Sequence, residues 1–126
     1  MSHDVVADGL NVIKNAKRAG KETVEINRIS NLLIEILKIM KQRGAVKKYK
    51  IDSKKRSVEI SIGDLSECKA IKPRFNVSKD QIDKYVRRYL PAKNFVYLII
   101  STNKGLMTHN EAIEKNIGGS LIAYVF

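Results

Sequence analysis

The stretch NFVYLIISTNKGLMTHNEA, residues 94–112, carries three structural signals in close succession. FVYLII is an apolar run typical of a buried strand, and the STNKG that follows is polar and contains a glycine. Thr108 and Glu111 have the spacing of a capping box, which predicts the start of a short helix. A strand, a turn and a helix in this order indicate a unit that mixes both kinds of element.

The flanking residues extend this C-terminal unit. KAIKPRF, residues 69–75, predicts an edge strand because Pro73 cannot donate to a central ladder. Ser78 and Gln81 form another capping box, and the helix after it should end at Pro91. Its inward side is predicted to carry Ile82, Tyr85, Val86 and Tyr89, and its outward side Lys84, Arg87 and Arg88. After Gly118 and Gly119, SLIAYVF predicts the last strand.

The N-terminal half predicts a different arrangement. Apolar spacing favours a helix over residues 4–19 and a second helix that Ser30 caps and that runs to Arg43, with TVEI as a strand between them. VKKYKI and SVEISI alternate with a period of two around the turn DSKKR, which predicts an antiparallel hairpin. We therefore expect an α+β fold: a helix-strand-helix-hairpin unit over residues 1–62, packed against a β-rich unit with short helices over residues 63–126, divided at the loop GDLSEC.

Charge is the strongest signal of function. The chain has 24 basic and 13 acidic residues, a net charge of +11, and the excess is +7 through residue 62 and +4 after it. Because the excess is spread over the predicted elements, we expect a basic face on a folded body and a polyanionic partner. Nucleic acid is the first expectation.

Several other classes are disfavoured. The longest apolar run, residues 95–100, is far shorter than a membrane span, and we find no secretory signal, so a cytoplasmic protein is expected. The single cysteine, Cys68, fits a reducing compartment, and no phosphate loop, zinc or serine-hydrolase motif is present. His3 and His109 lack further ligands at a suitable spacing. We expect no catalytic residue, metal, cofactor or small-molecule substrate.

Two polar segments are candidate contacts for RNA. The first helix places Lys14, Lys17 and Lys21 at helical spacing beside amide and guanidinium groups, a stripe that also fits an ordinary solvated face. STNKG offers hydroxyls, an amide and one cation, the groups that read phosphates and 2′-hydroxyls of folded RNA. The chain has only eight aromatic residues, so stacking on single strands is the weaker mode.

The chain resembles the universal small-subunit ribosomal protein eight family, of the archaeal or eukaryotic cytosolic type. The resemblance runs in order through DVVADGLNVIKNAKRAGKETVEI, SNLLIEILKIMKQRGAV, KPRFNV, LPAKNFVYLIISTNKGLMTHNEA and GGSLIAYVF. It implies a structural constituent of the small ribosomal subunit, in the cytoplasm, that binds and helps fold the central domain of small-subunit rRNA beside neighbouring ribosomal proteins, with no membrane partner.

The resemblance also implies which residues contact the rRNA. The C-terminal loop and the first helix supply them: Asn11, Lys14, Asn15, Arg18, Ser101, Thr102, Asn103, Lys104, Gly105, Thr108, Gly118, Gly119 and Ser120. Asn103, Ser120 and Lys69 depart from the commoner family residues. Two alternatives stay open: a regulatory protein that binds messenger RNA, and a small RNA-processing enzyme that uses His109 and Glu111.

Overall fold

The computed structural model describes residues 5–54, 56–71, 76–89 and 97–126. Its chain divides into two compact units, Met1–Cys68 and Lys69–Phe126. The loop of residues 63–68 thus groups with the first unit, and whether each unit is an independent domain stays a prediction. The expectations for Pro73, Pro91 and Phe95 lie outside the described residues.

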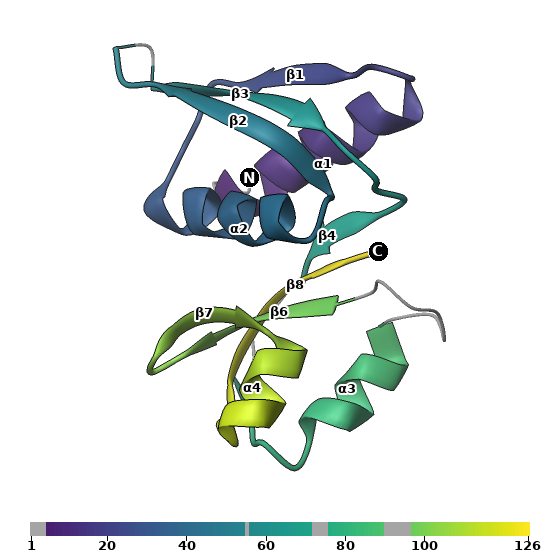
Figure 1. The fold of residues 1–126 in the computed structure, drawn as a ribbon, viewed down its shortest axis with the longest axis vertical. Coiled ribbons are helices and arrows are strands. Elements are labelled where there is room, and N and C mark those ends of the chain that lie inside the picture. Colours follow the sequence, from purple (N-terminus) through teal and green to yellow (C-terminus); the bar gives the residue numbers. More distant parts are fainter. Residues whose placement is uncertain (1–4, 55, 72–75, 90–96) are drawn as a thin grey trace. The chain divides into compact units, whose positions relative to one another are not determined.

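The first unit is a three-stranded antiparallel sheet with two helices on one face (Figure 1). The order along the chain is α1 (Val5–Arg18), β1 (Thr23–Ile26), α2 (Asn31–Gln42), β2 (Val46–Asp52) and β3 (Ser57–Ile62), with β3 central in the sheet. The predicted helices, strand and hairpin are all confirmed. Ser30 caps α2 as predicted, since its hydroxyl oxygen accepts from the Leu33 N–H at 3.2 Å.

The core of the first unit follows from the two periodicities. Alternate residues of the strands face the helices, and both helices present one apolar side to the sheet. The fully buried side chains there are Leu10, Ile13, Leu33, Ile36, Leu37, Met40, Val58 and Ile60. The opposite face of the sheet carries polar and charged residues.

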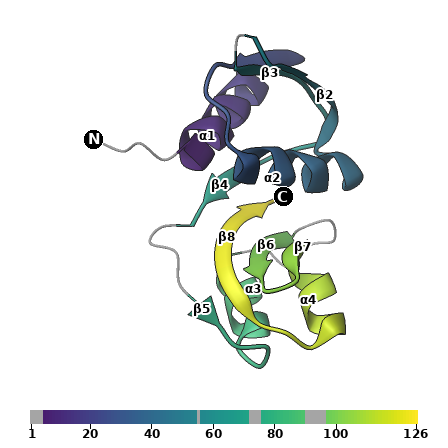
Figure 2. The ribbon, with the colours of Figure 1, turned by 90° about the vertical axis from the view of Figure 1, so that its left-hand side faces the viewer.

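The second unit is an antiparallel sheet in the order β4-β8-β6-β7, with β5 also paired to β8. Its strands are β4 (Cys68–Ala70), β5 (Asn76–Val77), β6 (Tyr97–Thr102), β7 (Gly105–Thr108) and β8 (Gly119–Val125), and its helices are α3 (Ile82–Tyr89) and α4 (His109–Lys115). Figure 2 shows the long, curved β8, with β5 alongside its start and β6 beside it. The α+β class is confirmed.

Both helices of this unit cover the same face of the sheet. Ile82 of α3 and Ala112 of α4 share one apolar cluster with Leu98, Ile100 and Leu121. Because strand residues alternate between faces, the neighbours of Ile100 and Leu121 along each strand point away from the helices. This alternation determines where the predicted site residues lie.

Two local expectations for this unit need correction. STNKG is not a five-residue turn: Ser101 and Thr102 end β6, and Gly105 begins β7, a strand that the sequence pattern did not reveal. α3 begins at Ile82, after a turn in which the Ser78 N–H donates to Gln81 Oε1 at 3.2 Å and the Gln81 N–H to the Ser78 carbonyl at 3.0 Å. The bond from the Ser78 N–H to the Gln81 side chain, which the predicted capping box requires, is present. It closes the turn before α3, however, and the helix begins only at Ile82.

Candidate RNA interface

Ser101 lies at a corner of the C-terminal sheet where four strands meet. It is the cross-strand partner of Ser120 in β8 and of Leu106 in β7, and Ser120 is in turn the partner of Asn76 in β5. Direct partners point to the same face, so two hydroxyls and an amide form one row on the face opposite the helices. Ser101 and Ser120 are half-buried and Asn76 is exposed.

Two glycines make this close pairing of strands feasible. A Cβ on Gly119 would collide with the Ser101 carbonyl oxygen, and one on Gly118 with the Val77 carbonyl oxygen. Any larger residue would push β8 away from its neighbours. Packing thus accounts for the pair of glycines that the sequence singled out, and it holds Ser120 next to Ser101.

Thr102 has a different position from Ser101. It follows Ile100 by two residues and so points to the helix side of the sheet. Its hydroxyl donates to the Gly105 carbonyl at 2.8 Å and accepts from the Lys104 N–H at 3.1 Å. Both bonds close the hairpin turn, in which Gly105 takes a φ of +109° that favours glycine. The exposed tip is left to Asn103 and Lys104.

Thr108 lies beneath the surface. It is 1% exposed, and its hydroxyl oxygen accepts from the Glu111 N–H at 3.4 Å, which confirms the capping box of α4. Thr108 therefore stabilises the start of α4 and is not part of the exposed candidate surface.

The basic stripe of α1 is partly engaged within the first unit. Arg18 Nη2 donates to Glu67 Oε2 at 2.9 Å, and Lys14 Nζ lies 3.5 Å from Glu67 Oε1. Lys17 Nζ donates to the Gly63 carbonyl at 3.0 Å. These contacts fasten the loop of residues 63–68 to the helix, so part of the charge is balanced internally.

The remaining groups of the stripe face solvent. Asn11 and Asn15 are exposed, and the Arg18 side chain is 62% exposed although it pairs with Glu67, whereas Lys14 is only 17% exposed. The structure therefore makes Asn11, Asn15 and Arg18 accessible on α1, and makes Lys14 mainly an internal partner. Sequence reasoning missed Glu67 and Asn76, because each acquires its neighbours only through tertiary pairing.

His109 and Cys68 serve the fold. His109 is 7% exposed, and its Nδ1 accepts from the Leu98 N–H at 3.0 Å, which leaves Nε2 to carry the proton of a neutral ring. Cys68 is fully buried, and its Sγ donates to the Leu10 carbonyl at 3.3 Å. Burial, reinforced by the nearby Glu67 carboxylate, raises the pKa of the Cys68 thiol to about 12, which makes it a poor nucleophile.

In the part of the chain that the structure describes, no group of three or more His, Cys, Asp or Glu side chains could hold a metal ion. Among the same residues no helix is both long and apolar enough to cross a membrane. What the structure offers is a two-unit α+β protein with a polar, glycine-packed sheet corner and a basic composition.

Comparisons with the sequences of known proteins place this chain in a family. The sequence model described as Ribosomal protein S8 matches residues 4–126. The chain is 45% identical to a protein of Nanoarchaeum equitans, 41% to one of Picrophilus torridus and 39% to one of Archaeoglobus fulgidus. Each alignment covers all of both proteins, and each relative is named small ribosomal subunit protein uS8, which is not the name of an enzyme. The chain belongs to the ribosomal protein S8 family, which confirms the resemblance.

Proposed function

We propose that this protein is a structural constituent of the small ribosomal subunit that binds the central domain of small-subunit rRNA and helps it fold. Its relatives are named as proteins of that subunit, so rRNA and neighbouring ribosomal proteins are its expected partners, and the cytoplasmic ribosome its location. The observation that carries the finer proposal is the row of Asn76, Ser120 and Ser101 beside the exposed hairpin tip.

The chemistry of this corner suits folded RNA. Hydroxyl and amide side chains can both donate to phosphates and bond 2′-hydroxyls, which distinguish RNA from DNA. Lys104 at the tip adds a cation, and the exposed Asn11, Asn15 and Arg18 of α1 offer a second, separate set of contacts. In this proposal the corner gives specificity and the cations give attraction that does not depend on sequence.

The test is equilibrium binding to a transcript of the rRNA central domain and to an unrelated hairpin of equal length, each over a series of salt concentrations. The double variant Ser101→Ala/Ser120→Ala should lose most of its preference for the cognate transcript. Ser66→Ala, which removes an exposed hydroxyl elsewhere, is the matched control and should bind as the wild type does.

Lys104→Ala should instead weaken both RNAs about equally and reduce the slope of log affinity against log salt by about 1. Lys38→Ala removes an exposed cation from α2 and serves as the control for charge alone. Equal affinity of the wild type for both transcripts, or an unchanged preference in the double serine variant, would reject the proposal.

A further inference from the structure

The loop of residues 63–68 contacts the basic stripe of α1 and is fixed to this helix at both of its ends. At its start, the Gly63 carbonyl accepts from Lys17 Nζ at 3.0 Å. At its end, Cys68 Sγ donates to the Leu10 carbonyl at 3.3 Å. Because a side chain between two such anchors has a defined position, the loop can hold one group against the helix.

Glu67 is the group that the loop holds there. Its Oε2 accepts from Arg18 Nη2 at 2.9 Å, and its Oε1 lies 3.5 Å from Lys14 Nζ. The side chain is only 21% exposed, and Oε1 is buried without a hydrogen bond from any residue that the structure describes. A polar atom in this state costs free energy, so packing alone does not account for an acid at this position.

The carboxylate affects its two cations differently. Lys14 is 17% exposed and pairs with Glu67, so little of its charge is available to a phosphate. Arg18 is 62% exposed, and its bond to Glu67 engages one nitrogen of the guanidinium. A guanidinium has five N–H donors in a planar fork, so the donors that Glu67 does not engage remain accessible in one set orientation.

Arg18 continues an exposed polar row on α1. Asn11, Asn15 and Arg18 are spaced at i, i+4 and i+7, lie along one side of the helix and are all exposed. The acid within α1 itself, Asp8, has its Oδ2 3.5 Å from Arg28 Nη1 and therefore does not compete for Arg18. The row ends in a planar cation that can form paired hydrogen bonds with a phosphate or with the edge of a guanine.

We propose that Glu67 is a specificity-determining residue of the RNA interface. It positions the Arg18 guanidinium for the cognate RNA and keeps Lys14 from attracting RNA of any sequence. Freely rotating cations attract every polyanion, whereas an oriented fork favours RNA whose acceptors match it. The inference rests on the proposed function, because it requires α1 to contact rRNA. It assigns a positive role to a carboxylate that, by charge alone, would only weaken RNA binding.

The test compares the affinities for the cognate transcript and for the unrelated hairpin over a series of salt concentrations. Glu67→Gln should bind the unrelated hairpin roughly two- to fivefold more tightly, and its preference for the cognate transcript should fall by a similar factor, the range of one exposed ion pair. For the unrelated hairpin the slope of log affinity against log salt should steepen by about 1, because Lys14 is released. Arg18→Lys keeps the charge but removes the fork, so it should lower the preference without tightening the unrelated hairpin.

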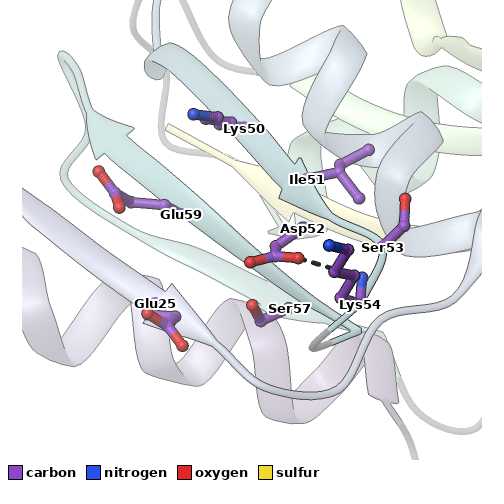
Figure 3. A pocket seen from close by; sticks show the side chains of 8 residues that line it. All are labelled: Glu25, Lys50, Ile51, Asp52, Ser53, Lys54, Ser57 and Glu59. Atoms are coloured by element: carbon purple, nitrogen blue, oxygen red, sulfur yellow. Dashed lines mark hydrogen bonds between the residues drawn. The ribbon is translucent and has the colours of Figure 1, made fainter.

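Glu59→Gln is the matched control, because it removes one exposed carboxylate from the same unit. Glu59 lies on β3, on the face of the sheet away from the helices and beside its cross-strand partner Lys50 (Figure 3). This variant should keep the preference of the wild type. In the double variant Glu67→Gln/Arg18→Ala the preference should equal that of Arg18→Ala, since no guanidinium is left to position.

Three results would overturn the proposal: an unchanged preference in Glu67→Gln, an equal fall in Glu59→Gln, or a further fall when Glu67→Gln is added to Arg18→Ala. A purely structural role would weaken both RNAs alike and leave the preference and the salt slope as they are. Unfolding curves check the fold of each variant, and Arg18→Lys, which changes an exposed side chain, tests the positioning even where Glu67→Gln is poorly folded. A wild type without preference would reject the proposed function as well, whereas loss of preference in the double serine variant but not in Glu67→Gln would reject this proposal alone.

Discussion

Gly119→Ala should destabilise the C-terminal unit through a clash of backbone with backbone. A Cβ at this position would lie 2.9 Å from Ile100 Cγ2 and even closer to the carbonyl oxygen of Ser101. Since that oxygen belongs to a strand, it cannot swing away as the end of a flexible side chain can. β8 must therefore separate from β6 at the pair of Ser101 and Ser120.

The magnitude follows from two opposing terms. Gly119 is not among the glycines with positive φ, so alanine adds no backbone strain there. Inserting an atom into a close-packed contact costs about 1–3 kcal/mol. The reduced entropy of the unfolded alanine chain returns about 0.5–1 kcal/mol. The difference of these ranges is a loss of about 0–2.5 kcal/mol in the free energy of unfolding. Because the nearest atom is a backbone oxygen that cannot move aside, we expect the upper half of that range.

Native-state hydrogen exchange measures this loss where it occurs. Amides of β6 and β8 should exchange faster in Gly119→Ala, while those of the β2–β3 hairpin in the other unit serve as the internal reference. Ser120→Ala, which adds no atom, is the matched control and should leave exchange nearly unchanged. If Gly119→Ala exchanged as slowly as the wild type, the close approach of β8 to Ser101 would be refuted, and with it the geometry of the candidate corner.

Three further changes test other parts of the structure. Glu67→Gln should lower the free energy of unfolding by about 0.5–1 kcal/mol, measured by denaturant titration, because two ion pairs to α1 are lost. If the freed Arg18 then contacts phosphate, the variant should also bind RNA more tightly in an equilibrium binding assay. The pKa of the Cys68 thiol is about 12 in the folded chain and 9.0 in the unfolded chain. Because only the unfolded chain then ionises this thiol, the free energy of unfolding is unaffected below pH 9 and falls as the pH rises from 9 toward 12. At pH 10 the wild type should have lost on the order of 1 kcal/mol more than Cys68→Ala, and equal losses in unfolding experiments would contradict this. His109→Leu should cost about 1–3 kcal/mol in thermal unfolding, since it leaves the buried Leu98 N–H without its acceptor, whereas an unchanged melting temperature would argue against that bond.

Features encoded within a few residues could be predicted from the sequence. The caps at Ser30 and Thr108, and the hairpin around the turn DSKKR, depend on neighbours along the chain. β7 was missed because GLMT is too short to show a period of two, and its strand character comes from pairing with β6. Predictions of this kind fail where pairing supplies the information.

The same reason separates the predicted site from the one in the structure. Ser101 and Thr102 are adjacent in sequence and looked equivalent, yet strand alternation places them on opposite faces. Asn76 reaches the corner only because β5 pairs with the start of β8. No local pattern reveals either fact.

Net charge likewise overstates what a basic helix can offer a polyanion. Arg18 and Glu67 are 49 residues apart in sequence. The residues near α1 therefore do not predict that a distant carboxylate neutralises part of the basic stripe on this helix. A phosphate that approaches Lys14 must displace Glu67 from a cation that is only 17% exposed, whereas Arg18 can keep its carboxylate and still present its remaining N–H groups. We therefore expect Arg18, together with the uncharged amides of Asn11 and Asn15, to contribute more to RNA binding than Lys14. A prediction from the lysines of the helix alone would give Lys14 the larger contribution.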